Sequence, residues 1–298
     1  MNAHPAVGLP ATQVRRAAPP PRWRAFAARI RRNAIGSTGA VIILATLACA
    51  LLGPLAWRTD YASQASRRLM APSAAHPLGT DELGRDELSR IVHGTQVSLQ
   101  VGIISVVIAL VSGTVTGVAA GFYGGAVDAV LMRAVDIMFA FPGLVLAIVI
   151  AGLLGPSRTN AMVAIGIVYA PAFARVVRGS TLGVLGLPYV EAARSLGISD
   201  ARIVRRHLLP NIMAPLIVLT TVYLSTAILT EAALSFLGLG TQPPEPSWGS
   251  MLNAARSYME RAPWLAVAPG LAIMIVVLGF NFLGDGLRDV LDPQLRDA

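Results

Sequence analysis

Lysine is absent from the 298-residue chain, so all 24 basic residues are arginine. Charged residues make up only 13% of the sequence and hydrophobic residues 54%, a balance too apolar for an ordinary soluble domain. The formal net charge of +8 is a property that nucleic-acid-binding proteins share, but here the arginines are distributed among long apolar runs. We therefore expect a membrane protein that binds no nucleic acid.

Cysteine and histidine are also scarce. Cys49 is the single cysteine, which excludes an intrachain disulfide and a cysteine metal cluster. The histidines His4, His76, His93 and His207 are scattered without the spacing of metal ligands. No GxxxxGK[ST] phosphate-binding loop is present. We therefore expect no catalytic residues, no metal, no cofactor and no ATP hydrolysis in this chain.

Six apolar runs without charge predict an all-α fold with six transmembrane helices. Each run approaches or exceeds the roughly 20 residues that cross ~30 Å of hydrocarbon. The fourth is the shortest because Arg175 and Arg178 follow it, and we expect these side chains to snorkel to the headgroups from its last turn. The runs cover residues 34–57, 94–127, 137–157, 159–174, 208–230 and 262–284.

The predicted spans divide the chain into segments that we assign to the cytoplasmic or the extracytoplasmic side. A signal peptide is the alternative for the start, but the first run has no convincing small-residue cleavage site. Arginine-rich segments favour the cytoplasmic side, which places both termini and the loop 187–210 inside. The predicted regions are a basic tail 1–33, a first helix 34–57, an extracytoplasmic segment 58–93, a five-helix domain 94–290 and a tail 291–298.

Several residues within or beside the spans carry specific expectations. Gly113, Gly117 and Gly121 form a small-residue stripe, which favours packing within this chain over a dimer contact. Arg133 and Asp136 are spaced for a local ion pair at the cytoplasmic boundary. Glu231 lies at the outer end of the fifth span, where contact with a substrate and interfacial solvation are equally compatible with the sequence.

The loop 187–210 is a charged, helix-patterned island between apolar spans. Pro188 and Glu191 suit the first turn of a helix predicted over 189–196, and Gly197 ends it. Ser199 is a plausible N-cap for a second helix from Asp200 to about residue 208. An ordinary basic cytoplasmic loop is the alternative that charge alone leaves open.

The order of residues in this loop resembles the EAA loop of ATP-binding-cassette importer permeases. Glu191-Ala192-Ala193, the later Gly197 and the downstream Leu209-Pro210 carry the resemblance. In that family the loop is a coupling helix that docks into a groove on a separate ATPase subunit. The resemblance implies a docking surface made of Glu191, Ala192, Ala193, Ser195, Leu196, Gly197 and Asp200.

Three further stretches resemble the second permease subunit of dipeptide and oligopeptide importers, a branch that includes glutathione and nickel transporters. They are residues 76–86, 234–249 and 280–293. The first is turn-rich and polar, and the second contains Trp248, which is suited to the membrane interface, so we expect both to lie against the outer leaflet or a docked partner.

The resemblance implies a type I importer permease in the bacterial inner membrane that forms half of a pore for peptides. Its implied partners are a homologous second permease, two ATPase subunits that bind ATP and Mg, a periplasmic or lipid-anchored solute-binding protein and the surrounding membrane lipids. An ion-coupled secondary transporter and a membrane-embedded hydrolase are the competing functions. They predict mid-membrane charges or His and Asp pairs, which the apolar runs lack.

Overall fold

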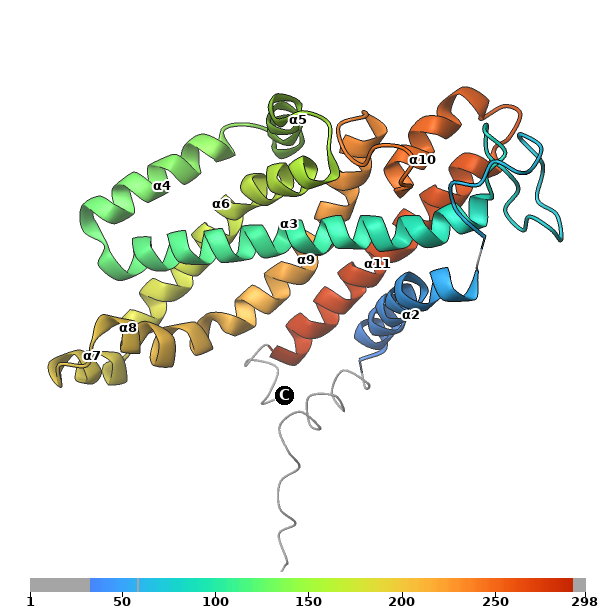
Figure 1. Ribbon diagram of the computed structural model, residues 1–298. Coiled ribbons are helices and arrows are strands. Elements are labelled where there is room, and N and C mark those ends of the chain that lie inside the picture. The colour runs from blue at the N-terminus through green and yellow to red at the C-terminus, as the bar shows by residue number, and fades with distance from the viewer. Residues whose placement is uncertain (1–32, 58, 292–298) are drawn as a thin grey trace, which may run out of the picture.

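The computed structural model describes residues 33–57 and 59–291, which form an elongated bundle of helices (Figure 1). In this described part, extended pairing is limited to an isolated bridge between Thr80 and Asp86. The predicted basic tail 1–33, apart from Asn33, and most of the predicted tail 291–298 lie outside it. The helices are α2 Ala34–Ala56, α3 Glu87–Tyr123, α4 Gly125–Phe139, α5 Gly143–Leu154, α6 Arg158–Leu185, α7 Pro188–Ser195, α8 Asp200–Ile203, the π-helical turn η1 Val204–Leu208, α9 Leu209–Phe236, α10 Trp248–Ala255, the 3₁₀ turn η2 Arg256–Tyr258 and α11 Trp264–Leu291.

The all-α class is confirmed, but the third predicted span is not one straight helix. Five helices of the described residues are long and apolar enough to cross a membrane, and a sixth span exists only if α4 and α5 are counted together. These two are bent by 94°. Pro142 explains the break, because it lacks an amide hydrogen and disfavours a helical residue before it. The predicted span 137–157 therefore contains the end of α4, the bend and the whole of α5.

The fourth span is longer than predicted, since α6 continues past Arg175 and Arg178 to Leu185. The expectation that these arginines snorkel from the last turn is wrong. Arg178 donates two hydrogen bonds of 2.5 Å to Asp128 of α4, and the Arg175 guanidinium lies 2.8 Å from Asp136. Because α4 supplies both counter-ions, the helix continues without exposing an unpaired charge. The predicted local pair of Arg133 with Asp136 is likewise replaced by this contact.

The glycine stripe of α3 packs against α6 of the same chain, as predicted. A Cβ atom placed on Gly117 would lie 2.4 Å from the carbonyl oxygen of Ala174, and one on Gly113 would lie 2.5 Å from that of Ala170. Real Cβ atoms do not approach so closely. The absence of a side chain therefore allows the two backbones to touch, which is how helices associate in lipid.

We expect Gly117→Leu to lower the melting temperature of the purified protein. The leucine would overlap α6, and overpacking of this kind costs about 1–3 kcal/mol. Gly179→Leu is the matched control, since a Cβ at Gly179 meets nothing within 4 Å. Melting followed by size-exclusion chromatography should separate the two variants. Equal melting temperatures would mean that the α3–α6 contact is not tight in the membrane.

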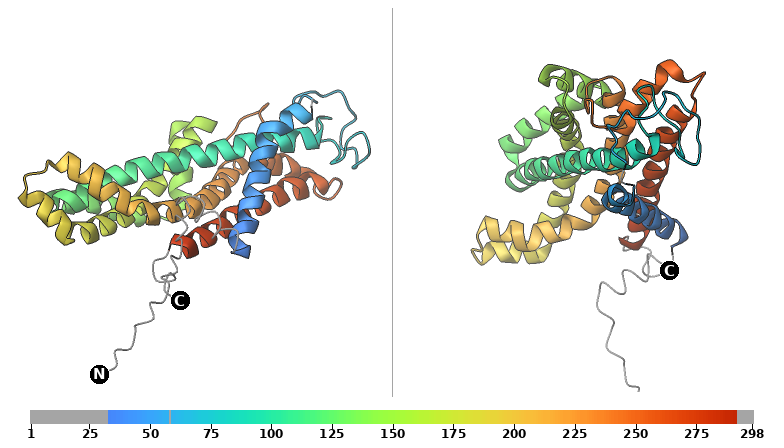
Figure 2. Two further views of the ribbon diagram at one scale, coloured as in Figure 1. Left: turned by 90° about the horizontal axis from the view of Figure 1, so that it is seen from below. Right: turned by 45° about the vertical axis from the view of Figure 1, so that its right-hand side comes forward.

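The two ends of the bundle carry different structures. The short helices α7 and α8 lie at one end, and the loop 59–86 with α10 lies at the other (Figures 1 and 2). The first helix, α2, packs on the last, α11, where Gly36 meets Gly286 and Gly39 meets the backbone of Leu283. The long α3 begins beside the loop 59–86 and ends beside α8, so it connects the two ends.

Candidate coupling loop and the folded cap at the opposite end

The helix α7 forms close to the predicted residues. Leu187 is extended, Pro188 occupies the first turn, where a missing amide hydrogen costs nothing, and Glu191 is the acidic residue of that turn. The helix ends at Ser195, and Gly197, which follows the C-cap residue Leu196, has a φ of +72°. The Gly197 amide donates to the carbonyl of Arg194 and the Ile198 amide to that of Ala193, the pattern of a Schellman motif. Gly197 is therefore needed for its left-handed backbone.

The second short helix is less regular than predicted. It is α-helical only over Asp200–Ile203, and Val204–Leu208 then form a π-helical turn that runs into α9. Ser199 has the extended backbone of an N-cap, but its side chain accepts no capping hydrogen bond. Pro210 explains the wider turn, because it cannot donate to the carbonyl four residues earlier. Such π turns are frequent at functional sites.

The predicted docking residues do not all share one face. Glu191, Ala192, Ser195 and Leu196 are exposed, and Leu196 is the most prominent at 80% exposure. Ala193 is buried together with Val190, so it supports α7 from beneath and offers no surface to a partner. Gly197 forms the turn, and Asp200 starts α8. The exposed surface therefore combines the carboxylates of Glu191 and Asp200, small residues and an apolar tip.

Contacts from α7 reach two of the spanning helices. The Arg194 guanidinium lies 5.1 Å from the ring centroid of Phe122 at the end of α3. The Asn211 amide of α9 donates to the Tyr189 hydroxyl at 3.1 Å, and the Tyr189 ring lies 5.8 Å from that of His207. A force applied to α7 would therefore act on the same ends of α3 and α9.

Two cavities follow the seam between α3 and the start of α9. One of about 410 Å³ lies between Phe122 and Tyr123 of α3 and Asp200 and Val204 of the loop. The second, of about 460 Å³, extends along α3 and α9, and both are lined almost entirely by apolar atoms. Open grooves therefore lie between α3 and the start of α9, whereas the backbones of α3 and α6 touch at the glycine stripe.

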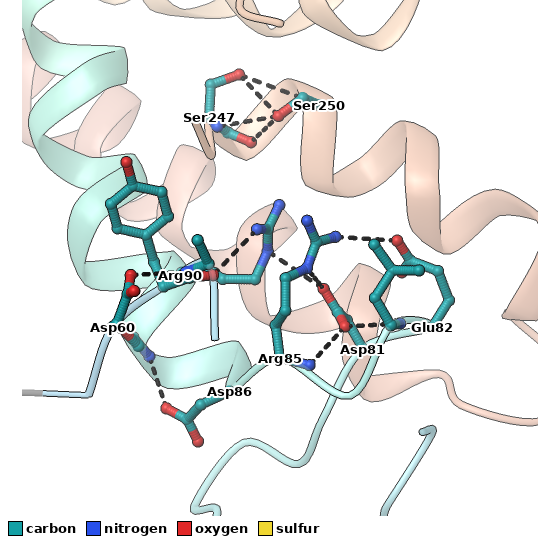
Figure 3. Close-up of polar contacts among 12 residues, drawn as sticks. Asp60, Asp81, Glu82, Arg85, Asp86, Arg90, Ser247 and Ser250 are labelled. Carbon is teal, nitrogen blue, oxygen red and sulfur yellow. Dashed lines mark hydrogen bonds and ion pairs between the residues drawn. The ribbon is translucent and has the colours of Figure 1, made fainter. Parts of the chain in front are cut away.

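The opposite end is a folded cap made of residues 59–86 and 237–263. Asp81 is its centre: the side chain accepts from Arg85 Nε at 2.5 Å and from the Arg85 backbone amide at 2.8 Å (Figure 3). The Nε atom of Arg90 lies 3.4 Å from the same carboxylate. All three side chains are buried. The buried Asp81 carboxylate is therefore paired with two arginines, and these ion pairs hold the loop 59–86 against the start of α3.

Asp86 attaches the cap to the first helix of the bundle. Its carboxylate accepts from the Ser89 amide at 2.8 Å, as the N-cap of α3, and from Trp57 Nε1 at 2.9 Å. It also lies 2.8 Å from Nδ1 of His76. Sequence reasoning identified this stretch as polar and turn-rich but missed its buried charges. The i,i+4 spacing of Asp81 and Arg85 was the available signal.

The cap corrects two expectations. Glu231 is 1% exposed and accepts a hydrogen bond from Ser235 Oγ at 2.7 Å, so neither substrate contact nor interfacial solvation applies to it. Trp248 is also 1% exposed, so its ring is covered by protein and offers no surface to lipid headgroups. The reason for both is α10, which folds back onto α3: the Trp248 amide donates to Ser98 Oγ at 3.3 Å. A helix this short leaves little periodicity in the sequence.

The chain is similar to known transport proteins over most of its length. The family described as "binding-protein-dependent transport system inner membrane component" matches residues 113–297. The chain is 46% identical over 275 residues to the dipeptide transport system permease protein DppC of Alkalihalophilus pseudofirmus, covering 92% of this chain and 90% of the relative. It is 45% identical over 276 residues to the glutathione transport system permease protein GsiD of Pectobacterium atrosepticum, covering 92% of each.

A solved structure shares the fold. The inward-facing MetNI methionine ABC transporter matches with a TM-score of 0.54 and 22% identity, covering 67% of this chain and 96% of the solved chain. The match to the family model extends over most of the chain, and the relatives match over nearly their whole length. The chain therefore belongs to the binding-protein-dependent transport system inner membrane component family and is an ATP-binding-cassette importer permease of the dipeptide branch.

Proposed function

We propose that this chain forms half of an inner-membrane pore that imports short peptides. The observation that carries the proposal is its full-length similarity to permeases named for dipeptide and for glutathione transport. Glutathione is itself a short peptide, so one substrate class fits both names, and it remains the alternative substrate. The second half of the pore is a homologous permease, and a solute-binding protein delivers the peptide.

The loop 187–210 couples the pore to two ATPase subunits, which bind ATP and Mg. The exposed α7 surface, its Schellman end and its contacts with α3 and α9 support this role. Both termini and this loop lie in the cytoplasm, because that orientation places the loop arginines inside. Closure of the ATPase pair then moves α7, and α9 shifts against α3 where the two grooves lie between them. Alternating access follows from such a two-state element.

Reconstitution tests this function. Proteoliposomes are prepared with this chain, the second permease, both ATPases and the binding protein. They should transport a labelled dipeptide when ATP is supplied on the side of the membrane that carries the ATPase subunits. Excess unlabelled glutathione should compete if it shares the pathway. Vesicles that contain only this chain should neither hydrolyse ATP nor transport. Uptake by the single chain under a proton or sodium gradient would contradict the proposal and support a secondary transporter.

A further inference from the structure

Four exposed arginines lie on the cap, far from the coupling loop. Arg67 and Arg68 belong to the loop 59–86, Arg256 belongs to η2, and Arg261 precedes α11. Within the described part of the chain, none of the four has a carboxylate within 4.0 Å of its guanidinium. The other arginines that the structure describes at this end differ: Arg85 and Arg90 are buried beside Asp81, and Arg158 lies 3.1 Å from Glu245.

The two pairs of arginines lie on segments that are in contact. Leu69, which follows Arg68, packs with Tyr258 against the buried cluster of Ala255, Ala262 and Leu265. The loop 59–86 and the turn between α10 and α11 are therefore in contact, as Figure 1 also shows. The exposed acids of this surface are Asp60 and Glu260, which the arginines outnumber. We call these four arginines the basic cap surface.

Membrane topology does not explain this surface. In the proposed orientation the cap is extracytoplasmic, where the rule that orients membrane proteins disfavours arginine. An excess of arginine over exposed acid attracts partners of opposite charge. The cap is held rigidly by the buried pairs of Asp81 with Arg85 and Arg90 and by the contacts of Asp86. The backbone of the cap is therefore ordered before a partner arrives, which lowers the entropy cost of binding.

We propose that the basic cap surface receives an acidic face of the solute-binding protein. This inference rests on the proposed function, because it names the surface on which the delivering partner docks. Exposed charges act mainly on encounter: complementary charge raises the association rate and aligns the partners, and it is screened by salt. Small uncharged residues between Ala71 and Ala75 are exposed in the same loop, so a partner can approach the backbone closely.

The test measures association of the fluorescently labelled cognate solute-binding protein with the complete transporter in nanodiscs of phosphatidylcholine. The variants are Arg67→Gln with Arg68→Gln, and Arg256→Gln with Arg261→Gln. At low salt each double variant should associate roughly fivefold or more slowly than the unmodified transporter, and the difference should shrink at high salt. Arg158→Gln combined with Glu245→Gln is the matched control, because it removes both members of an ion pair and leaves the net charge of the cap unchanged. It should leave the rate unchanged.

Each outcome decides the proposal. Unchanged association of both double arginine variants at low salt would overturn it, as would an equal loss when Arg158→Gln and Glu245→Gln are combined. A rate difference that appears only in nanodiscs with anionic lipid would assign the surface to lipid headgroups and also overturn it. If the unmodified transporter bound no solute-binding protein at any salt concentration, the proposed function itself would fail, which is a distinct result. Melting temperatures of the variants establish that the cap remains folded.

Discussion

Gly197→Leu should reduce transport at least about tenfold while the chain remains inserted in the membrane. Gly197 has a φ of +72°, a left-handed conformation that costs residues with a side chain roughly 1–2 kcal/mol. A difference of about 1.4 kcal/mol changes a population tenfold. A Cβ at this position meets nothing within 4 Å, so the effect arises from the backbone and not from a clash. The leucine variant should lose the Schellman end of α7 and present Leu196 and Glu191 differently.

Gly197→Asn tests whether position 197 requires a left-handed backbone or only a small residue. Asparagine tolerates the left-handed region better than leucine does, so this variant should retain much of the transport. Uptake by proteoliposomes and the amount of each variant in the membrane are the measurements. Transport that falls equally in both variants would point to contact of the glycine itself with a partner. Normal transport in Gly197→Leu would show that the bend is not required.

The elements set by local signals were predicted well from the sequence. Pro188, Glu191 and Gly197 fixed α7 to within a residue at each end, because caps and turn residues act over neighbouring positions. The glycine stripe of α3 likewise identified its own packing, because close approach of helices requires small residues over several turns. The apolar runs located the spans, since the bilayer sets their length.

The errors share a different cause, which is a partner distant in the sequence. Arg175 and Arg178 looked like the end of a span until Asp136 and Asp128 of α4 were seen beside them. Glu231 looked interfacial because nothing in the chain near it reveals that α10 covers it. Pro142 lies within the predicted run 137–157, but a sequence gives no measure of a 94° corner. The distribution of charged and apolar residues predicts which segments lie in the membrane. It does not predict which charged side chains form ion pairs across the fold.

The resemblance to the EAA loop located the candidate site, and the burial of its side chains shows which of its residues are exposed. The assignment of the loop 187–210 as the coupling element remains a prediction. The structure adds that Ala193 lies beneath α7 while Ala192 and Glu191 are exposed, which sequence order cannot distinguish. A triplet of adjacent residues on a helix always points in different directions, about 100° apart. Only the first two residues of the Glu191-Ala192-Ala193 triplet are therefore available to a partner.

Glu191→Lys should weaken association with the ATPase subunits roughly 30-fold or more and abolish stimulated ATP hydrolysis. The substitution places a positive charge in the first turn of α7, which costs about 0.3–1 kcal/mol through the helix dipole. Reversal of a charge that is paired in an interface costs roughly 2–5 kcal/mol more, and about 2 kcal/mol corresponds to the 30-fold loss. Insertion should be unaffected, because Glu191 is exposed at the end of the bundle and outside the spanning helices.

Arg202→Ala is the control for a charge change in the same loop. Arg202 is exposed on α8, and its loss should have a milder effect because it removes a charge without opposing one. Membrane levels, co-purification of the ATPases and hydrolysis stimulated by the loaded binding protein are measured together. If Glu191→Lys associates and responds normally, α7 does not dock on the ATPase through this carboxylate. If Arg202→Ala is impaired as severely, the loop acts through its overall charge, and the specific role of Glu191 is contradicted.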